Sequence, residues 1–477
     1  MKKAGFFLGM ILLLSVGKVF SQTVVIPDLN FRKFLVTYYG SVMDANQELI
    51  IANAASVTGT FYCGEANIAS LEGIQYFKGI TALSCIKNNL TTLPDLSNLI
   101  NLTEIYAYEN QITVLPPLNK LVNLKILNVM DNKLSAFPDI TGLINLAEIY
   151  VYRNQLTSIP DLSGFGNLQT FQCYENKITS IGKMPASLKD LNFGRNLITS
   201  FPDISLATGL IYLSCYVNQL SSVPELSAFT SLVQLNLGTN KITSVPNSLS
   251  SLTNLTYLTL DNNLLTSLPD LSSLTQLTYF DLKKNYLTFE DFIPSSSNPT
   301  FKIWEVGPQN LIEVTSSFKG IQNKAIEIEF PFDQNMNDLT FSWYQNNALR
   351  TQTSEPSLVI SSLDKSDNGT YYCQVTSSNA LLSSLNFTTT SFTITVLPDF
   401  ISGKELTLTP NGDGKNDEIY FEENGTLKVY DSSGNLVDKM TSPCYWNGLK
   451  KSGEELPIGF YVIRINEDIT YEINVVK

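Results

Sequence analysis

Residues 146–160 read LAEIYVYRNQLTSIP, and this stretch decides the fold because close copies of it follow one another along the chain. Side chains on a β-strand alternate between its two faces. A strand here therefore turns Ile149 and Val151 towards a core and directs Tyr150 and Tyr152 away from it. The repetition predicts the fold, and the outward tyrosines raise the question of function.

The stretch belongs to a repeat with the template LxxLxLxxNxL, whose asparagines recur every 20 to 23 residues. An earlier copy, TGTFYCGEANI, has Ala66 in the asparagine position. Each short strand presents apolar residues that only a neighbouring repeat can bury, so the repeats predict a stacked solenoid. The template asparagines are Asn88, Asn110, Asn132, Asn154, Asn176, Asn196, Asn218, Asn240, Asn263 and Asn285.

This template resembles the leucine-rich repeat family, which implies a mostly β protein with about 11 solenoid coils of about 22 residues over residues 58–300. A helical cap is expected over residues 22–57, where Asp28 is a candidate N-cap before Phe31 and Leu35 at helical spacing. We interpret the asparagines as structural, because a side-chain amide can bond backbone groups left unpaired at a turn. The proline-containing return segments predict extended or 3₁₀ turns rather than long helices.

The first residues, MKKAGFFLGMILLLSVGKVFSQ, are typical of a secretory signal peptide over residues 1–21, with Lys2 and Lys3 before an apolar run and cleavage after Ser21. The run is shorter than the roughly 20 residues of a membrane-spanning helix, and no later segment is apolar enough to span. Because removal also takes away Lys18, the net charge falls from −13 to −16, which argues against nucleic-acid partners. The absence of histidine excludes catalysis by imidazole.

The cysteines of the repeats occupy the core position of the template, which predicts buried thiols. Cys173 and Cys215 are two coils apart, about 9–10 Å at the usual strand spacing, which is beyond the reach of a disulfide. Parallel strands in register aim Cys63 and Cys85 inward side by side, so we expect these thiols to be unpaired as well.

Beyond the repeats, FSWYQNNALRTQTSEPSLVISSLDKSDNGTYYCQV resembles an immunoglobulin-like domain, through Trp343 and the motif from Asp367 to Cys373. The resemblance implies a β-sandwich over residues 301–398 with Tyr371 as its tyrosine corner. The earlier strand, AIEIEFPF, has no cysteine to pair with Cys373. Packing against Trp343 must therefore hold the two sheets together.

Residues 399–477 contain TPNGDGKND, VYDSSGNLV, Trp446 and LPIGFYV, and resemble the gliding-motility-associated C-terminal sorting domain of type IX secretion. The resemblance implies a small β-sandwich, the type IX secretion machinery as a partner, and export across an outer membrane followed by release or surface attachment. No cofactor is predicted, although one loop offers oxygen ligands that could bind calcium or form an ordinary turn. The residues of this loop are Asn411, Asp413, Asn416 and Asp417.

With the template fixed, the outward strand positions form two columns. A charged row runs beside them and consists of Glu109, Asp131, Arg153, Glu175 and Arg195. Aromatic and apolar residues gather between Ile86 and Tyr216, and the last coils turn polar. Stacked tyrosines reinforce a sheet, but reinforcement does not account for this clustering. Amphipathic side chains rimmed by charges match protein interfaces and sugar-stacking platforms. The predicted ligand-binding residues on the concave face are Tyr106, Tyr108, Met130, Tyr150, Tyr152, Arg153, Tyr174, Glu175 and Tyr216.

The sequence thus predicts a secreted or cell-surface recognition or adhesion protein that binds a protein ligand through this face. In an alternative hypothesis the tyrosines stack on sugar rings and the protein binds extracellular polysaccharide. A third hypothesis is an enzyme that uses carboxylates such as Glu109, Asp131 and Glu175. These residues lie in successive coils on an open face without a visible pocket, so we predict no enzymatic activity.

Overall fold

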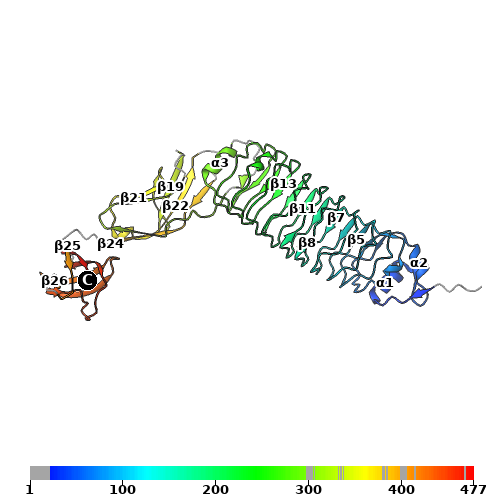
Figure 1. Cartoon of the computed structure of the whole chain (residues 1–477), viewed down its shortest axis with the longest axis horizontal. Coiled ribbons are helices and arrows are strands. Elements are labelled where there is room, and N and C mark those ends of the chain that lie inside the picture. The colour runs from blue at the N-terminus through cyan, green and yellow to red at the C-terminus, as the bar shows by residue number, and fades with distance from the viewer. Residues whose placement is uncertain are drawn as a thin grey trace, which may run out of the picture. The chain divides into compact units, whose positions relative to one another are not determined.

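The computed structural model describes residues 22–296 without a gap, and then 304–305, 307–330, 332, 336, 338–378, 382, 385–397, 405–412, 415–466 and 469–476. The predicted signal peptide, residues 1–21, lies outside the described residues. The chain divides into two compact units (Figure 1): Met1–Leu287 with Asp291–Val306, and Thr288–Glu290 with Gly307–Lys477. Within the described part of the chain, no helix is long and apolar enough to cross a membrane.

The first unit is a β-solenoid whose main sheet consists of 12 parallel strands (Figure 1). Neighbouring strands pair in register, so that Ile149 lies opposite Leu127 and Phe171. The sequence analysis placed the end of the solenoid at residue 300. The sheet continues beyond that residue and ends at β16. Its strands are β3 (Gly59–Tyr62), β4 (Ile80–Ser84), β5 (Glu104–Tyr106), β6 (Ile126–Asn128), β7 (Glu148–Tyr150), β9 (Thr170–Gln172), β11 (Asp190–Asn192), β12 (Tyr212–Ser214), β13 (Gln234–Asn236), β14 (Tyr257–Thr259), β15 (Tyr279–Asp281) and β16 (Trp304–Glu305).

The solenoid core is built from the apolar template positions, as predicted. Leu146, Ile149 and Val151 are fully buried, and the equivalent residues of the other coils are buried in the same way. The return segments are mostly turns, with 3₁₀ helices η2 (Ile74–Tyr76) and η3 (Asn247–Ser251). Helix α3 (Phe289–Ser296) follows the last complete coil.

The cap at the start of the solenoid contains α1 (Leu29–Tyr38), as predicted. Asp28 caps this helix, because its Oδ1 accepts a hydrogen bond from the backbone N of Phe31 at 2.8 Å. Its Oδ2 accepts a second bond from Ala69 N at 2.8 Å, which ties the helix to the first coil. Phe31 is buried edge-on against Phe61. The remaining cap elements are β1 (Thr23–Val24), η1 (Gly40–Val42), β2 (Leu49–Ile50) and α2 (Ile51–Ser56).

The template asparagines form a hydrogen-bonded ladder that joins each coil to the one before it. In Asn154, Oδ1 accepts a bond from Leu134 N at 2.9 Å, while Nδ2 donates to Val129 O at 3.0 Å and to Val151 O at 3.2 Å. The same pattern recurs at the neighbouring template asparagines Asn132 and Asn176. The prediction that these residues are structural is confirmed, and their bonds to the preceding coil add a link that the template alone did not show.

The residue before each template asparagine adopts left-handed backbone geometry, with φ between 50° and 57° along the row from Lys87 to Lys284. This conformation opens the turn after the strand, and glycine and asparagine adopt it most readily. None of the ten residues in the row is glycine, and one of them, Asn262, is asparagine. Two members are β-branched, Val217 with φ of 51° and Thr239 with φ of 57°, and this conformation is strained for such side chains.

We expect the substitution Val217→Asn to raise the free energy of unfolding by about 1 kcal/mol, because left-handed backbone costs a residue with a Cβ roughly 1–2 kcal/mol and costs asparagine less. Urea denaturation followed by circular dichroism measures the change. Val114→Asn is the matched control, since Val114 is exposed and forms a β-bridge with Thr92 in extended backbone. A midpoint for Val217→Asn no higher than that of the control contradicts the argument from strain.

The cysteines are free, as predicted: Cys63, Cys85, Cys173, Cys215 and Cys373 are all buried and unpaired. Burial raises the pKa of the Cys85 and Cys373 thiols to about 12. Because the thiolate is the reactive form, these residues behave as small apolar core residues.

Within the second unit, residues 317–397 form two β-sandwich-like sheets. One sheet has the order β17-β24-β22-β19-β20, with β23 paired to β22, and the other pairs β18 with β21. The first contains β17 (Ser317–Ile321), β19 (Leu339–Gln345), β20 (Ala348–Thr353), β22 (Gly369–Ser377), β23 (Asn386–Thr388) and β24 (Phe392–Leu397), and the second contains β18 (Ile326–Glu329) and β21 (Ser357–Ile360). The 3₁₀ helix η4 (Lys365–Asp367) precedes β22.

The core of these sheets centres on Trp343, which pairs with Cys373 across β19 and β22. The ring of Phe330, which follows β18, stacks on Trp343 with centroids 4.9 Å apart. Phe330 belongs to the segment AIEIEFPF, which has no cysteine to pair with Cys373. This segment thus contributes an aromatic ring to the core instead of a disulfide. The Tyr371 hydroxyl donates to Asp367 O at 2.8 Å, the bond that a tyrosine corner makes to the chain upstream.

The C-terminal part of the unit is a separate five-stranded sheet with the order β25-β29-β28-β26-β27. Its core contains Phe421, Trp446 and Ile463. None of its strands pairs with the sheets of residues 317–397 in the described part of the chain. Its strands are β25 (Glu405–Leu408), β26 (Ile419–Asp431), β27 (Leu436–Trp446), β28 (Gly459–Ile465) and β29 (Ile469–Val475).

Candidate binding face of the solenoid

The side of the 12-stranded sheet that faces away from the core, called the sheet face here, brings the predicted ligand residues together. Residues at the same template position are register partners, so Tyr106, Asn128 and Tyr150 follow one another across three strands. The next outward position, which includes Tyr108 and Tyr152, follows each strand end. All nine predicted residues lie on this face or in the charged row beside it, between the coils of β5 and β12.

The centre of the sheet face is a stacked tyrosine pair. The rings of Tyr152 and Tyr174 lie 4.2 Å apart between centroids, with 13° between their planes. Both side chains are half-buried. Burial raises the pKa of Tyr174, with a further contribution from the Tyr152 hydroxyl beside it, so its hydroxyl is protonated at neutral pH.

Gly194, which follows Tyr174 in the same column, allows the aromatic surface to continue to Tyr216. A Cβ on Gly194 would lie 2.2 Å from Cε1 of the Tyr216 ring. The missing side chain therefore lets Tyr216 lie over the backbone of the preceding coil. The guanidinium of Arg195 lies 5.7 Å from the centroid of the same ring, within the range of a cation–π contact.

The charged row beside the tyrosines is a chain of ion pairs. Arg153 lies between two carboxylates, with Nε 2.9 Å from Oε2 of Glu175 and Nη1 3.6 Å from Oδ2 of Asp131. Arg195 Nε lies 3.7 Å from the other oxygen of Glu175. Hydrogen bonding to Glu175 raises the pKa of Arg153, so the guanidinium stays charged. Such exposed pairs add little stability, at most about 1 kcal/mol each, but they hold the side chains in place.

Tyr106 and Tyr150 have acidic neighbours that the sequence analysis did not single out. The Tyr150 hydroxyl donates to Oε2 of Glu148 at 2.8 Å. Burial, together with the nearby Glu104 carboxylate, raises the pKa of Tyr106 to about 12. Partial burial likewise raises the pKa of the Asp190 carboxyl group.

These acids belong to a third outward column, formed by the first residue of each sheet strand from β5 to β15, which the sequence analysis missed. The column turns from acidic to aromatic along the solenoid, and Tyr257 and Tyr279 stack at 4.6 Å with 7° between their rings. The expectation that the last coils turn polar concerned the other two columns and did not cover this one. The sequence signal for this column is the residue just before the second leucine position of the template LxxLxLxxNxL. The column comprises Glu104, Ile126, Glu148, Thr170, Asp190, Tyr212, Gln234, Tyr257 and Tyr279.

The loop proposed for calcium is a hydrogen-bonded turn. Oδ1 of Asp417 accepts bonds from the backbone N of Asn411 at 3.0 Å and of Gly412 at 2.8 Å. Asn416 has a positive φ of 56°, and Asp413 lies outside the described residues. Among the residues that the structure describes, no group of three or more His, Cys, Asp or Glu side chains could hold a metal ion. Calcium binding at this loop stays a prediction.

Comparison with known proteins agrees with the architecture of the first unit. Residues 100–142 and 208–251 match the family model described as Leucine Rich repeats (2 copies). The matched segments of the solenoid are therefore leucine-rich repeats. A search of the curated proteins finds no match.

Several solved structures are similar to the chain. The functional domain of InlJ from Listeria monocytogenes, which includes a cysteine ladder, is 21% identical, covers 79% of this chain and 99% of that chain, and has a TM-score of 0.51. An internalin, inlF, from Listeria monocytogenes is 23% identical over 58% of this chain and 87% of its own, with a TM-score of 0.45. YopM from Yersinia enterocolitica is 27% identical over 48% and 56%, with a TM-score of 0.39. The similarity to InlJ shows a shared fold.

Proposed function

We propose that the protein is an exported recognition or adhesion protein whose sheet face binds a protein ligand. The observation that carries this proposal is the continuous aromatic surface of Tyr152, Tyr174 and Tyr216, bordered by the ion pairs of Arg153. Tyrosines at the centre of a surface, with charged residues that include arginine at its border, match the composition of protein interfaces.

A protein ligand fits the tyrosine geometry better than the alternative of a polysaccharide. A sugar ring stacks on the open face of an aromatic ring. The facing surfaces of Tyr152 and Tyr174 cover each other, and the ring of Tyr216 lies over Gly194. One face of each stacked ring is therefore covered, and the ring edges and hydroxyls of the pair are offered to a ligand. Binding to a glycan array that is lost with these tyrosines would favour the polysaccharide instead.

Two of the carboxylates considered for catalysis act as ion-pair partners of an arginine. Asp131 and Glu175 are both paired with Arg153 on the exposed border of the sheet face. Enzyme active sites usually lie in enclosed pockets, where side chains and substrate are shielded from water. We therefore propose no enzymatic activity for this face.

We expect the triple substitution of Tyr108, Tyr152 and Tyr174 by serine to weaken ligand binding at least about 30-fold, since hot-spot residues contribute about 2 kcal/mol or more each. The ligand is first captured from the extracellular milieu with the full mature chain, and its affinity is then measured by surface plasmon resonance. The fold should persist, because these side chains lie outside the core.

The double substitution of Tyr257 and Tyr279 by serine is the matched control, because it removes an equally stacked pair outside the predicted site. If the tyrosines only reinforce the sheet, both variants lose up to about 1 kcal/mol of stability for each aromatic pair and neither loses the ligand. Full binding of the ligand by the triple variant would show that these tyrosines of the sheet face do not bind it.

Export follows, in this proposal, from the signal peptide at residues 1–21 and the type IX sorting domain at residues 399–477. The sheets of residues 301–398 serve as an immunoglobulin-like spacer between the recognition unit and the sorting domain. The Tyr371 bond to Asp367 supports the immunoglobulin-like assignment. In this arrangement the solenoid at residues 58–300, with its cap at residues 22–57, is displayed or released outside the cell.

A further inference from the structure

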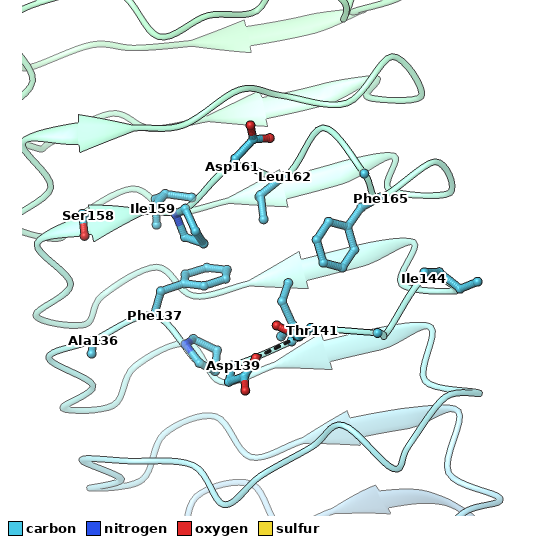
Figure 2. A pocket seen from close by; sticks show the side chains of 15 residues that line it. Ala136, Phe137, Asp139, Thr141, Ile144, Ser158, Ile159, Asp161, Leu162 and Phe165 are labelled. Carbon is cyan, nitrogen blue, oxygen red and sulfur yellow. Dashed lines mark hydrogen bonds between the residues drawn. The ribbon is translucent and has the colours of Figure 1, made fainter.

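The solenoid has a cavity of about 670 Å³ between the return segments of two neighbouring coils, residues 136–144 and 158–165. Figure 2 shows Phe137 from one coil and Leu162 and Phe165 from the next around this space. None of the cavity residues belongs to the sheet face. The volume is within the range of pockets that bind ligands, about 300–1,000 Å³.

At this cavity, where every residue is described, the return segment of one coil forms backbone hydrogen bonds with the return segment of its successor and none with that of its predecessor. Strands β8 (Ser158–Ile159) and β10 (Ser180–Ile181) pair in parallel, and Leu162 N donates to Lys183 O at 2.8 Å. Gly182 permits this approach, since a Cβ there would lie 2.5 Å from Asp161 N. Towards the preceding coil, no backbone hydrogen bond joins residues 135–144 to residues 157–166, a stretch that is described without a gap.

Two glycines line the gap. Gly142 and Gly164 occupy the same template position in the two coils, and a Cβ on either would meet no atom within 4 Å. Other coils have a side chain at this position, and the cavity therefore coincides with the two consecutive coils that lack one. The side chains in the other coils include Asn98, Lys120, Leu206 and Ala228.

The rim of the cavity is acidic. Asp139 and Asp161 lie on opposite sides of the apolar side chains (Figure 2), and no lysine or arginine lines the space. Hydrogen bonds from Thr141 lower the pKa of Asp139, and those from Ser163 lower the pKa of Asp161, so both are ionised at neutral pH. An apolar cavity between two carboxylates is complementary to an apolar group flanked by cations.

An exposed aliphatic stripe leads to the cavity from the preceding coils. Ile100, Val122 and Ile144 stand at one template position in three successive coils and are 55%, 50% and 61% exposed. Ile144 is also part of the cavity wall. A chain that crosses the coils along this stripe would thus reach the cavity with its apolar side chains already in contact.

We propose that this cavity and stripe bind an extended segment of a partner protein, which inserts a large apolar side chain flanked by lysine or arginine between Asp139 and Asp161. The apolar walls of Phe137 and Phe165 take the inserted side chain, and the two carboxylates take the flanking cations. The site is separate from the sheet face, so the proposal does not depend on the ligand proposed there.

Calorimetric titration of the full mature chain with three short peptides tests the proposal. Acetyl-Lys-Trp-Lys-amide is expected to bind at one site, and acetyl-Glu-Trp-Glu-amide and acetyl-Lys-Ala-Lys-amide are expected to bind at least about tenfold more weakly, a difference of about 1.4 kcal/mol. Gly164→Leu, which fills the cavity from a position without positive φ, should weaken Lys-Trp-Lys at least about tenfold. Ala228→Leu, at the equivalent template position outside the cavity, should leave binding unchanged.

Two results with the unaltered protein would overturn the proposal. One is equal binding of the Lys-Trp-Lys and Glu-Trp-Glu peptides, and the other is no binding of Lys-Trp-Lys at millimolar concentration. Unchanged affinity of the Gly164→Leu variant for Lys-Trp-Lys would show that the peptide does not bind in this cavity. Should Gly164→Leu fail to fold, the double substitution of Asp139 and Asp161 by asparagine decides, because both side chains are exposed and asparagine keeps an oxygen for the bonds from Thr141 N and Ser163 N. The tyrosine variants of the sheet face should bind Lys-Trp-Lys as the unaltered protein does, which separates the two sites.

Discussion

Replacing Asn154 by alanine is expected to lower the free energy of unfolding by about 3–5 kcal/mol, because it leaves several buried backbone groups without partners. Asn154 is 8% exposed, and its amide bonds Leu134 N, Val129 O and Val151 O. Alanine replaces none of these bonds, and each unsatisfied buried group costs about 1–3 kcal/mol. Urea denaturation measures the loss, and amide exchange at Leu134 should accelerate in parallel.

Asn145→Ala is the matched control within the same coil. The Asn145 side chain is on the surface, and its Nδ2 donates one bond to Val122 O at 2.9 Å. Water can replace that bond, so the control should cost less than about 1 kcal/mol. If Asn154→Ala costs no more than Asn145→Ala, the buried ladder is not what joins the coils.

Deleting the chain from Lys404 onward is expected to abolish appearance of the protein outside the cell and to retain it in the periplasm. The deletion removes the whole five-stranded sheet from β25 to β29, and this sheet shares no strand with the sheets of residues 317–397 in the described chain. The solenoid should therefore stay folded, and the loss should be one of delivery alone. Cell fractionation and surface proteolysis give the measurement.

Two further measurements make this result specific. A reporter that carries residues 1–21 at its start and residues 399–477 at its end should reach the outside of a cell with type IX secretion. The truncated protein, purified from the periplasm, should keep the unfolding midpoint of its solenoid. Surface display of the truncated chain at the level of the full chain would refute the sorting role.

The sequence determined the repeat, its core and the role of its asparagines. Apolar positions recur at fixed offsets from each asparagine, so one aligned template identifies Ile149, Val151 and their equivalents as buried. The tyrosines of two outward columns follow from the same alternation of side chains. The cap could also be predicted, since Asp28 and the helical spacing after it are local signals.

Only the tertiary structure decided what depends on the exact spacing between coils. Thr259 belongs to an outward column, yet it is 4% exposed because its hydroxyl donates to Asn236 Oδ1 of the preceding coil at 2.6 Å. The stack of Tyr257 on Tyr279 and the cavity at Gly164 likewise arise between coils. A template lists which residues share a position, but tilts and gaps of an ångström decide whether neighbouring side chains stack, bond or leave space. Those distances follow from the packing of all coils together, and no single repeat encodes them.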